Sequence, residues 1–151
     1  MDNRQELYQQ TILEHNRNPR NFKKLVPCTH SAEGYNPLCG DHLHIFMNVS
    51  AQGIIYEVTF EGQGCAISKA SASMMTQALK GKTVEEAKKT FDEFHKLLLV
   101  ELKPDRQPNT LGKMSVFSGI WQYPSRVKCS SLSWHTMHAA LEKVKTVYTE
   151  E

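Results

Sequence analysis

Residues 41–61 read DHLHIFMNVSAQGIIYEVTFE, which is two runs of alternating apolar and polar side chains joined by a short polar segment. In the first run, residues 41–49, the odd positions from Leu43 onward are apolar. In the second run, residues 54–61, the even positions are apolar. An alternation with a period of two is typical of a half-buried β-strand. Residues 50–53, SAQG, supply a turn. The stretch therefore predicts an antiparallel hairpin with one face against a core.

The sequence on either side of the hairpin predicts one further strand and several helices. Residues 29–35 are expected to be extended. The helical spacing of apolar residues and the Pro, Gly and capping signals predict five helices: one ending near Asn18, one from Cys65 to Gly81, one from Thr83, a short one around 111–121 that Pro124 ends, and a long one from about Cys129 to Tyr148. We therefore predict an α+β fold. It is a single domain over residues 1–151, in which a small three-stranded antiparallel sheet carries helices on one face, with an N-terminal helix and a long C-terminal helix.

Composition and charge exclude several classes of protein. The 151 residues include 40% hydrophobic and 23% charged side chains, with a net charge of +2 and interleaved signs, so no basic stripe indicates nucleic-acid binding. The longest aliphatic run, residues 97–100, is too short to span a bilayer. Residues 2–6, DNRQE, lack the apolar core of an export signal. We therefore expect a cytoplasmic protein whose cysteines serve as ligands or nucleophiles.

Three cysteines and one aspartate stand at the ends of the predicted elements. Cys39 and Asp41 lie just before the hairpin, and Cys65 follows its second strand. Cys129 lies at the predicted start of the last helix. Three thiolates and a carboxylate form a four-coordinate ligand set that is suited to zinc or to iron–sulfur chemistry.

The predicted hairpin brings three of these four side chains together. Cys39 and Asp41 share the parity of Leu43 and so point toward the core. Cys65 returns beside them, because the far end of the second strand in a hairpin lies next to the start of the first. Cys129 is expected to arrive with the last helix, whose N-terminus would favour its thiolate. We predict a metal site formed by Cys39, Asp41, Cys65 and Cys129.

Simpler interpretations of these residues remain alternatives. The three cysteines could be buried thiols without metal, as Cys28 is by default. They could also hold a purely structural zinc, although a hard, exchangeable carboxylate is unusual in such sites. A third possibility is a small protein-interaction module in which the metal only stabilises the fold. Four histidines are interpreted as surface or interface residues rather than ligands: His42, His44, His135 and His138.

The sequence resembles the U-type iron–sulfur cluster assembly proteins, the IscU/SufU family. Four ordered blocks carry this resemblance: HNRNPRNF at 15–22, NPLCGD at 36–41, FEGQGCAIS at 60–68 and PSRVKCSSLSW at 124–134. The resemblance implies an α+β fold and a role in cluster assembly beside a pyridoxal-phosphate-dependent cysteine desulfurase, with other iron–sulfur assembly proteins downstream.

Two features resemble the zinc-binding SufU branch more than the scaffold branch. Lys128 stands where scaffold members have a histidine, and the spacing from Cys65 to Cys129 is longer, with the extra segment expected within Thr83–Gln107. The SufU resemblance implies a zinc-dependent sulfurtransferase that accepts persulfide sulfur. The alternative is a scaffold that binds iron and builds a [2Fe–2S] cluster for transfer.

The SufU resemblance also implies roles for individual residues. Cys39 is the expected sulfur acceptor, and Cys129 is the second choice. Arg126 and Lys128 are expected to offset the negative charge of the site, Arg126 by reaching Asp41. An ammonium group offers no lone pair, so Lys128 is not expected to bind a metal.

Overall fold

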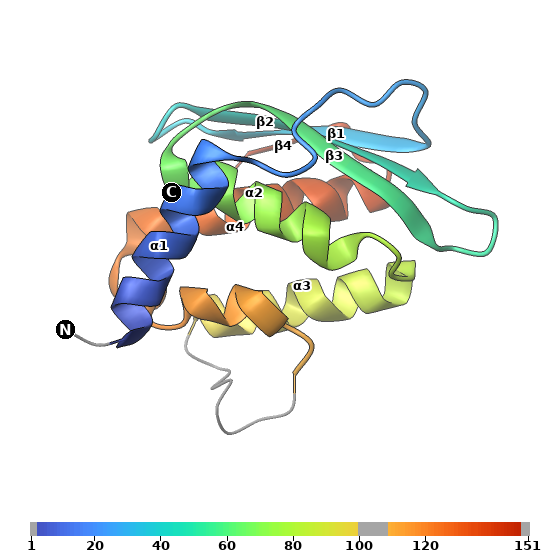
Figure 1. Ribbon diagram of the computed structural model, residues 1–151. Coiled ribbons are helices and arrows are strands. Elements are labelled where there is room, and N and C mark those ends of the chain that lie inside the picture. Colours follow the sequence, from blue (N-terminus) through green and yellow to red (C-terminus); the bar gives the residue numbers. More distant parts are fainter. Residues whose placement is uncertain (1–2, 100–108, 149–151) are drawn as a thin grey trace.

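The computed structural model describes residues 3–99 and 109–148 (Figure 1). In chain order the elements are α1 (Asn3–Arg17), β1 (His30–Asn36), β2 (Asp41–Val49), β3 (Ile55–Gln63), α2 (Ala66–Leu79), α3 (Val84–Leu98), the 3-10 helices η1 (Gly112–Phe117) and η2 (Ile120–Gln122), α4 (Pro124–Leu141) and β4 (Thr146–Tyr148). The predicted insertion at 83–107 contains α3, and its part from residue 100 onward lies outside the described residues. No helix in the described ranges has the length and apolar character needed to cross a membrane.

The α+β prediction is confirmed, but the sheet is mixed and has four strands in the order β3-β2-β1-β4. β2 pairs antiparallel with both β1 and β3, as predicted, whereas β4 pairs parallel with β1. The predicted long C-terminal helix is therefore wrong in its last part. The α4 helix ends at Leu141, and Lys143 turns the chain with a φ of 60°. Val144 and Tyr148, in the last part of the predicted helix, are 49% and 62% exposed.

A β-bulge changes the predicted facing at the start of β3, whereas Val58 and Phe60 are buried as predicted. Asn48 pairs with Glu57 and Val49 with Ile55, so Tyr56 is an extra residue in the ladder. A bulge reverses which parity faces the core. Ile55 is consequently fully buried, whereas Tyr56 is 48% exposed.

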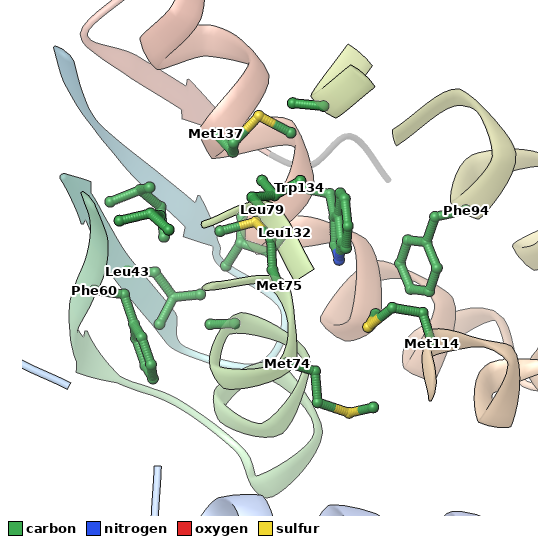
Figure 2. Close-up of a cluster of buried hydrophobic side chains, with 14 of the residues drawn as sticks. Leu43, Phe60, Met74, Met75, Leu79, Phe94, Met114, Leu132, Trp134 and Met137 are labelled. Carbon is green, nitrogen blue, oxygen red and sulfur yellow. The ribbon is translucent and has the colours of Figure 1, made fainter. Parts of the chain in front are cut away.

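The helices form two layers beneath one face of the sheet (Figure 1). The first layer consists of α4, which contacts β1 and β2, and α2, which contacts β3. The second layer is α3 with the 3-10 segment, and α3 contacts α4. Figure 2 shows Leu43 and Phe60 projecting from the sheet toward the helices, and Trp134 of α4 beside Phe94 of α3. The rings of Trp134 and Phe94 are 5.0 Å apart, and this contact joins the two helical layers.

The first block of the family resemblance, residues 15–22, ties α1 to α2 and β3. Buried His15 shares a hydrogen bond of 2.8 Å between its Nδ1 and the Ser73 hydroxyl on α2. The backbone N–H of Arg20 donates to the same hydroxyl at 2.8 Å. Asn21, with a φ of 58°, accepts a bond at its carbonyl from the N–H of Phe60. This block therefore fixes how α2 lies against the sheet.

Candidate metal centre

Three of the four predicted ligands meet at one end of the sheet. Cys39, Asp41 and Cys129 each offer one donor atom, and these atoms all lie within 4.8 Å of one another. The Cys129 and Cys39 sulfurs are 3.6 Å apart. Cys39 lies in the turn between β1 and β2, Asp41 begins β2, and Cys129 lies on α4. Residues about 90 positions apart are thus joined in one cluster of donors.

The turn between β1 and β2 exposes Cys39 at the rim of the cluster. The N–H of Cys39 donates to the Asn36 carbonyl at 3.2 Å, and Gly40 follows with a φ of 71°. A left-handed residue is readily supplied by glycine, so Gly40 lets the chain reverse within this short turn. Cys39 is exposed, whereas Asp41 and Cys129 are only 2% and 4% exposed. Of the three clustered donors, Cys39 is the one that another protein can reach.

The Asp41 carboxylate is held by a hydrogen bond at each oxygen. The side-chain amide of Asn36 donates to Oδ2 at 3.1 Å, and the backbone N–H of Cys65 donates to Oδ1 at 2.8 Å. Gly64 makes the second contact possible, because a Cβ there would lie 2.7 Å from Oδ1 and 2.5 Å from the Ser68 hydroxyl. These hydrogen bonds offset the free-energy cost of burying a carboxylate, which is high when the carboxylate has no partners.

Cys65 borders the cluster but is not in the group of three mutually close donors. It is the N-cap of α2, and its sulfur accepts the Ser68 N–H at 3.4 Å. A hydrogen bond from the Cys129 thiol, opposed by burial and helped by Ser68, lowers the pKa of Cys65 from 9.0 to about 6. The same hydrogen bond, together with burial, raises the pKa of Cys129. Cys65 is therefore the more acidic thiol of this pair.

The predicted placement of Cys129 at a helix N-terminus is wrong. Pro124 begins α4 rather than ending the preceding helix, because the first helical position needs no N–H and suits the fixed φ of proline. Cys129 consequently lies inside the helix, in its second turn. The thiolate that benefits from unpaired helix N–H groups is that of Cys65 at the start of α2.

The two predicted charge-balancing residues lie on the first two turns of α4, close to Cys129 in sequence. The guanidinium of Arg126 lies 4.6 Å from the ring centre of Tyr123. No ion pair joins Arg126 to Asp41 in the described part of the chain, so the expected approach of these two side chains is not found. Lys128 directly precedes Cys129 on α4 and is half-buried.

The remaining cysteine and the histidines lie away from the donor cluster. His42 and His44 contact Glu33 at 3.4 and 3.7 Å. His135 and His138 pack against Phe91, with ring centres 5.2 Å apart in both cases. Cys28 is half-buried and free. Sequence reasoning missed the roles of two residues around Asp41: Asn36, which donates to its carboxylate, and Gly64, which leaves room for it. The sequence feature that could have indicated them is their place beside the ligands, Asn36 in the NPLCGD block and Gly64 in the GQGC block.

The donor cluster fits a zinc ion. Two sulfurs bound to one tetrahedral zinc at about 2.3 Å each lie about 3.8 Å apart. The separation of the Cys39 and Cys129 sulfurs, 3.6 Å, is close to that value. The buried Asp41 carboxylate adds a hard oxygen donor to these two soft sulfurs.

Comparisons with known proteins agree with this architecture. Residues 7–130 match the family model described as the NifU-like N-terminal domain. The chain is 37% identical over 137 residues to the zinc-dependent sulfurtransferase SufU of Bacillus subtilis, covering 91% of this chain and 90% of that protein. It is 35% identical to the iron–sulfur cluster assembly scaffold protein IscU of Thermotoga maritima, covering 91% and 94%.

A solved structure shares the fold over nearly its whole length. It is the putative iron–sulfur cluster assembly scaffold protein for the SUF system from Fervidobacterium islandicum, with a TM-score of 0.82 and 31% identity. The alignment covers 90% of this chain and 97% of that one. The extent of these matches confirms the resemblance seen in the sequence blocks. This chain belongs to the NifU-like N-terminal domain family, in its IscU/SufU group.

Proposed function

We propose that this chain is a zinc-dependent sulfurtransferase of iron–sulfur cluster assembly, which accepts persulfide sulfur from a pyridoxal-phosphate-dependent cysteine desulfurase. The observation that carries the proposal is the convergence of Cys39, Asp41 and Cys129 within 4.8 Å. The name of the Bacillus subtilis relative, which states a zinc-dependent sulfurtransferase, supports it. Other iron–sulfur assembly proteins would receive the sulfur.

Cys39, Asp41, Cys65 and Cys129 would hold the zinc. The bound ion would keep the three thiols deprotonated at neutral pH. Cys65 would be the fourth ligand, because its backbone N–H already donates to Asp41 at 2.8 Å and its thiol interacts with Cys129. Lys128 and Arg126, on the first two turns of α4, would offset part of the negative charge of three thiolates and a carboxylate.

Cys39 is the proposed sulfur acceptor because it is exposed, while Cys129 is only 4% exposed. Its thiolate would attack the outer sulfur of the persulfide on the desulfurase cysteine. A new sulfur–sulfur bond forms on Cys39 as the bond in the donor persulfide breaks, and the donor cysteine leaves as a thiolate. One thiolate and one persulfide are consumed and one of each is produced, so the exchange needs no oxidant or reductant.

The second candidate function is a scaffold that assembles and transfers a [2Fe–2S] cluster. The Thermotoga maritima relative is named as such a scaffold, and thiolates with one carboxylate can bind iron. Anaerobic addition of iron and sulfide separates the two functions. A stable coloured cluster that passes to an apo-ferredoxin would favour the scaffold.

A desulfurase assay tests the proposed function. The zinc-loaded chain should raise sulfide release from cysteine by a desulfurase, and Cys39→Ser should abolish the increase while Cys28→Ser leaves it unchanged. Mass spectrometry of the trapped product should find the extra sulfur on Cys39. Unchanged stimulation by Cys39→Ser would contradict the proposed acceptor. Full sulfur transfer by Asp41→Ala, with only a lower Tm, would indicate a structural metal instead.

A further inference from the structure

The side chain of Asn36 links two of the candidate ligands. Asn36 ends β1, is fully buried and pairs with Asp41 across the β1–β2 ladder. Its amide nitrogen donates to Asp41 Oδ2 at 3.1 Å and lies 3.7 Å from the Cys129 sulfur, to which it also donates. A primary amide has two N–H donors, one for each of these two acceptors, whereas a side chain with no N–H would leave both acceptors without that hydrogen bond.

The contacts of the donors show which of them are held in place. Asp41 is fixed at one oxygen by Asn36 and at the other by the N–H of Cys65. Cys129 is fixed by the α4 backbone and by Asn36. Cys39, by contrast, lies on an exposed turn next to a left-handed glycine. The Asn36 side chain therefore bonds the carboxylate and the buried sulfur, whereas the exposed Cys39 thiol contacts the Cys129 sulfur at 3.6 Å.

We propose that Asn36 is a positioning residue of the metal centre. Its amide sets Asp41 and Cys129 at the separation that one zinc ion requires, so that the site is formed before the metal arrives and Cys39 is its exchangeable ligand. This inference rests on the proposed zinc site and adds to it a residue that does not itself touch the metal. Hydrogen bonds from such partners typically change metal affinity by about 10-fold to 100-fold.

Asn36→Ala and Asn36→Asp test the inference, with Asn48→Ala as the matched control. Asn48 is also a largely buried asparagine of the sheet, with side-chain bonds to Pro27 and Glu57 that are remote from the metal centre. Zinc affinity is measured by competition with a chromophoric chelator, and the visible spectrum is recorded after Co²⁺ loading. Both Asn36 variants should lose about 10-fold or more in zinc affinity, and their Co²⁺ spectra should change. Asn48→Ala should keep the wild-type affinity and spectrum.

A double-variant cycle shows whether Asn36 acts through the carboxylate. On an Asp41→Ala background, Asn36→Ala should lower the affinity much less than it does alone, because its main partner is already gone. An equal loss on both backgrounds would overturn the inference, as would wild-type affinity and an unchanged Co²⁺ spectrum in Asn36→Ala. Weak zinc binding by the wild-type chain would overturn the inference and the proposed function together. Tight wild-type binding that Asn36→Ala leaves intact would overturn the inference alone.

A measurement on the wild-type chain covers the case in which neither Asn36 variant folds. The side-chain N–H₂ resonances of Asn36 are followed by NMR during zinc titration. They should shift in step with metal loading, because both acceptors of the amide become ligands. The side-chain resonances of Asn48 should stay in place. An Asn36 resonance that is unchanged at full loading would overturn the inference.

Discussion

The backbone N–H of Cys65 donates a 2.8 Å hydrogen bond to Oδ1 of Asp41, across 24 residues of sequence. This bond joins the start of α2 to the start of β2. The first N–H groups of a helix have no partner within the helix and carry a partial positive charge. The Asp41 carboxylate and the Cys65 sulfur both lie at this helix end, so α2 supplies the electropositive side of the candidate metal centre.

Gly64→Ala should disturb this relationship directly. The added Cβ would lie 2.7 Å from Asp41 Oδ1 and 2.5 Å from the Ser68 hydroxyl, so the carboxylate or the helix start must move. We expect a loss of about 1–3 kcal/mol in the free energy of unfolding and a weaker zinc affinity in chelator competition. Gly81→Ala is the control, because Gly81 has a φ of 89° but open space around it. Gly81→Ala should lower stability by a similar amount and leave the zinc affinity unchanged. Equal zinc affinities in Gly64→Ala and Gly81→Ala would contradict the account.

In the metal-free protein, Cys65 should react as a thiolate at neutral pH. Its pKa is lowered from 9.0 to about 6, chiefly by the hydrogen bond from Cys129. Alkylation of Cys65, followed by peptide mass spectrometry across a pH series, should therefore reach half its maximal rate near pH 6 and fall at lower pH. Cys129→Ala removes the donor, so the midpoint should move upward. A midpoint near 9 in the wild-type chain would show that this hydrogen bond is not made.

Acidification should destabilise the chain through His15. Burial, with a further contribution from the nearby Arg20 charge, lowers the pKa of His15 below its ordinary 6.5. Below about pH 6.5, His15 binds a proton more readily in the unfolded chain than in the folded chain. The free energy of unfolding therefore falls as the pH falls through that range. One such group contributes at most about 1.4 kcal/mol per pH unit.

Urea unfolding of the wild-type chain and His15→Gln at pH 7.5 and 5.5 measures this contribution. The wild-type chain should lose more stability than His15→Gln, which keeps an amide near Ser73 but does not titrate. Zinc binding responds to pH in both proteins, so the difference between them isolates His15. Equal losses in the two proteins would exclude a role for this histidine.

Two substitutions in the core should differ sharply in cost. Phe94→Ala removes a fully buried ring that contacts Trp134 and Phe117, and we expect a loss of about 3–5 kcal/mol. Trp134→Phe should cost less than about 2 kcal/mol, because the buried Nε1 of Trp134 has no hydrogen-bond partner among the described residues. Thermal unfolding of both variants provides the comparison. A loss above about 2 kcal/mol for Trp134→Phe would mean that the indole N–H makes a hydrogen bond in solution.

Local patterns in the sequence predicted that Cys39 and Asp41 lie together with Cys65 beside them, but they did not predict how Cys129 reaches Cys39 and Asp41, nor the contacts that hold these side chains. The parity of Cys39 and Asp41 and the return of the hairpin to Cys65 follow from strand geometry alone. The amide of Asn36 could not be assigned in this way, because its partners lie on β2 and α4 and meet it only in the folded chain. Cys129 was placed at the wrong helical position because Pro124 is equally compatible with ending one helix and beginning the next.

The fold prediction failed where tertiary contacts outweigh local pattern. The helical spacing of Leu141, Val144 and Tyr148 suggested one long helix, but residues 146–148 gain hydrogen bonds by pairing with β1. The bulge at Tyr56 reversed the alternation only at the start of β3, a change that depends on pairing with β2. The order of the remaining strands and helices followed from their own periodicity and capping residues.

Zinc K-edge X-ray absorption on the freshly purified chain, combined with its metal content, tests the central claim most directly. The account predicts one zinc per chain, with three sulfur ligands at about 2.3 Å and one oxygen ligand at about 2.0–2.2 Å. Asp41→Cys should convert the spectrum to four sulfur ligands. Absence of zinc, or a wild-type spectrum that is unchanged by Asp41→Cys, would contradict the proposed ligand set.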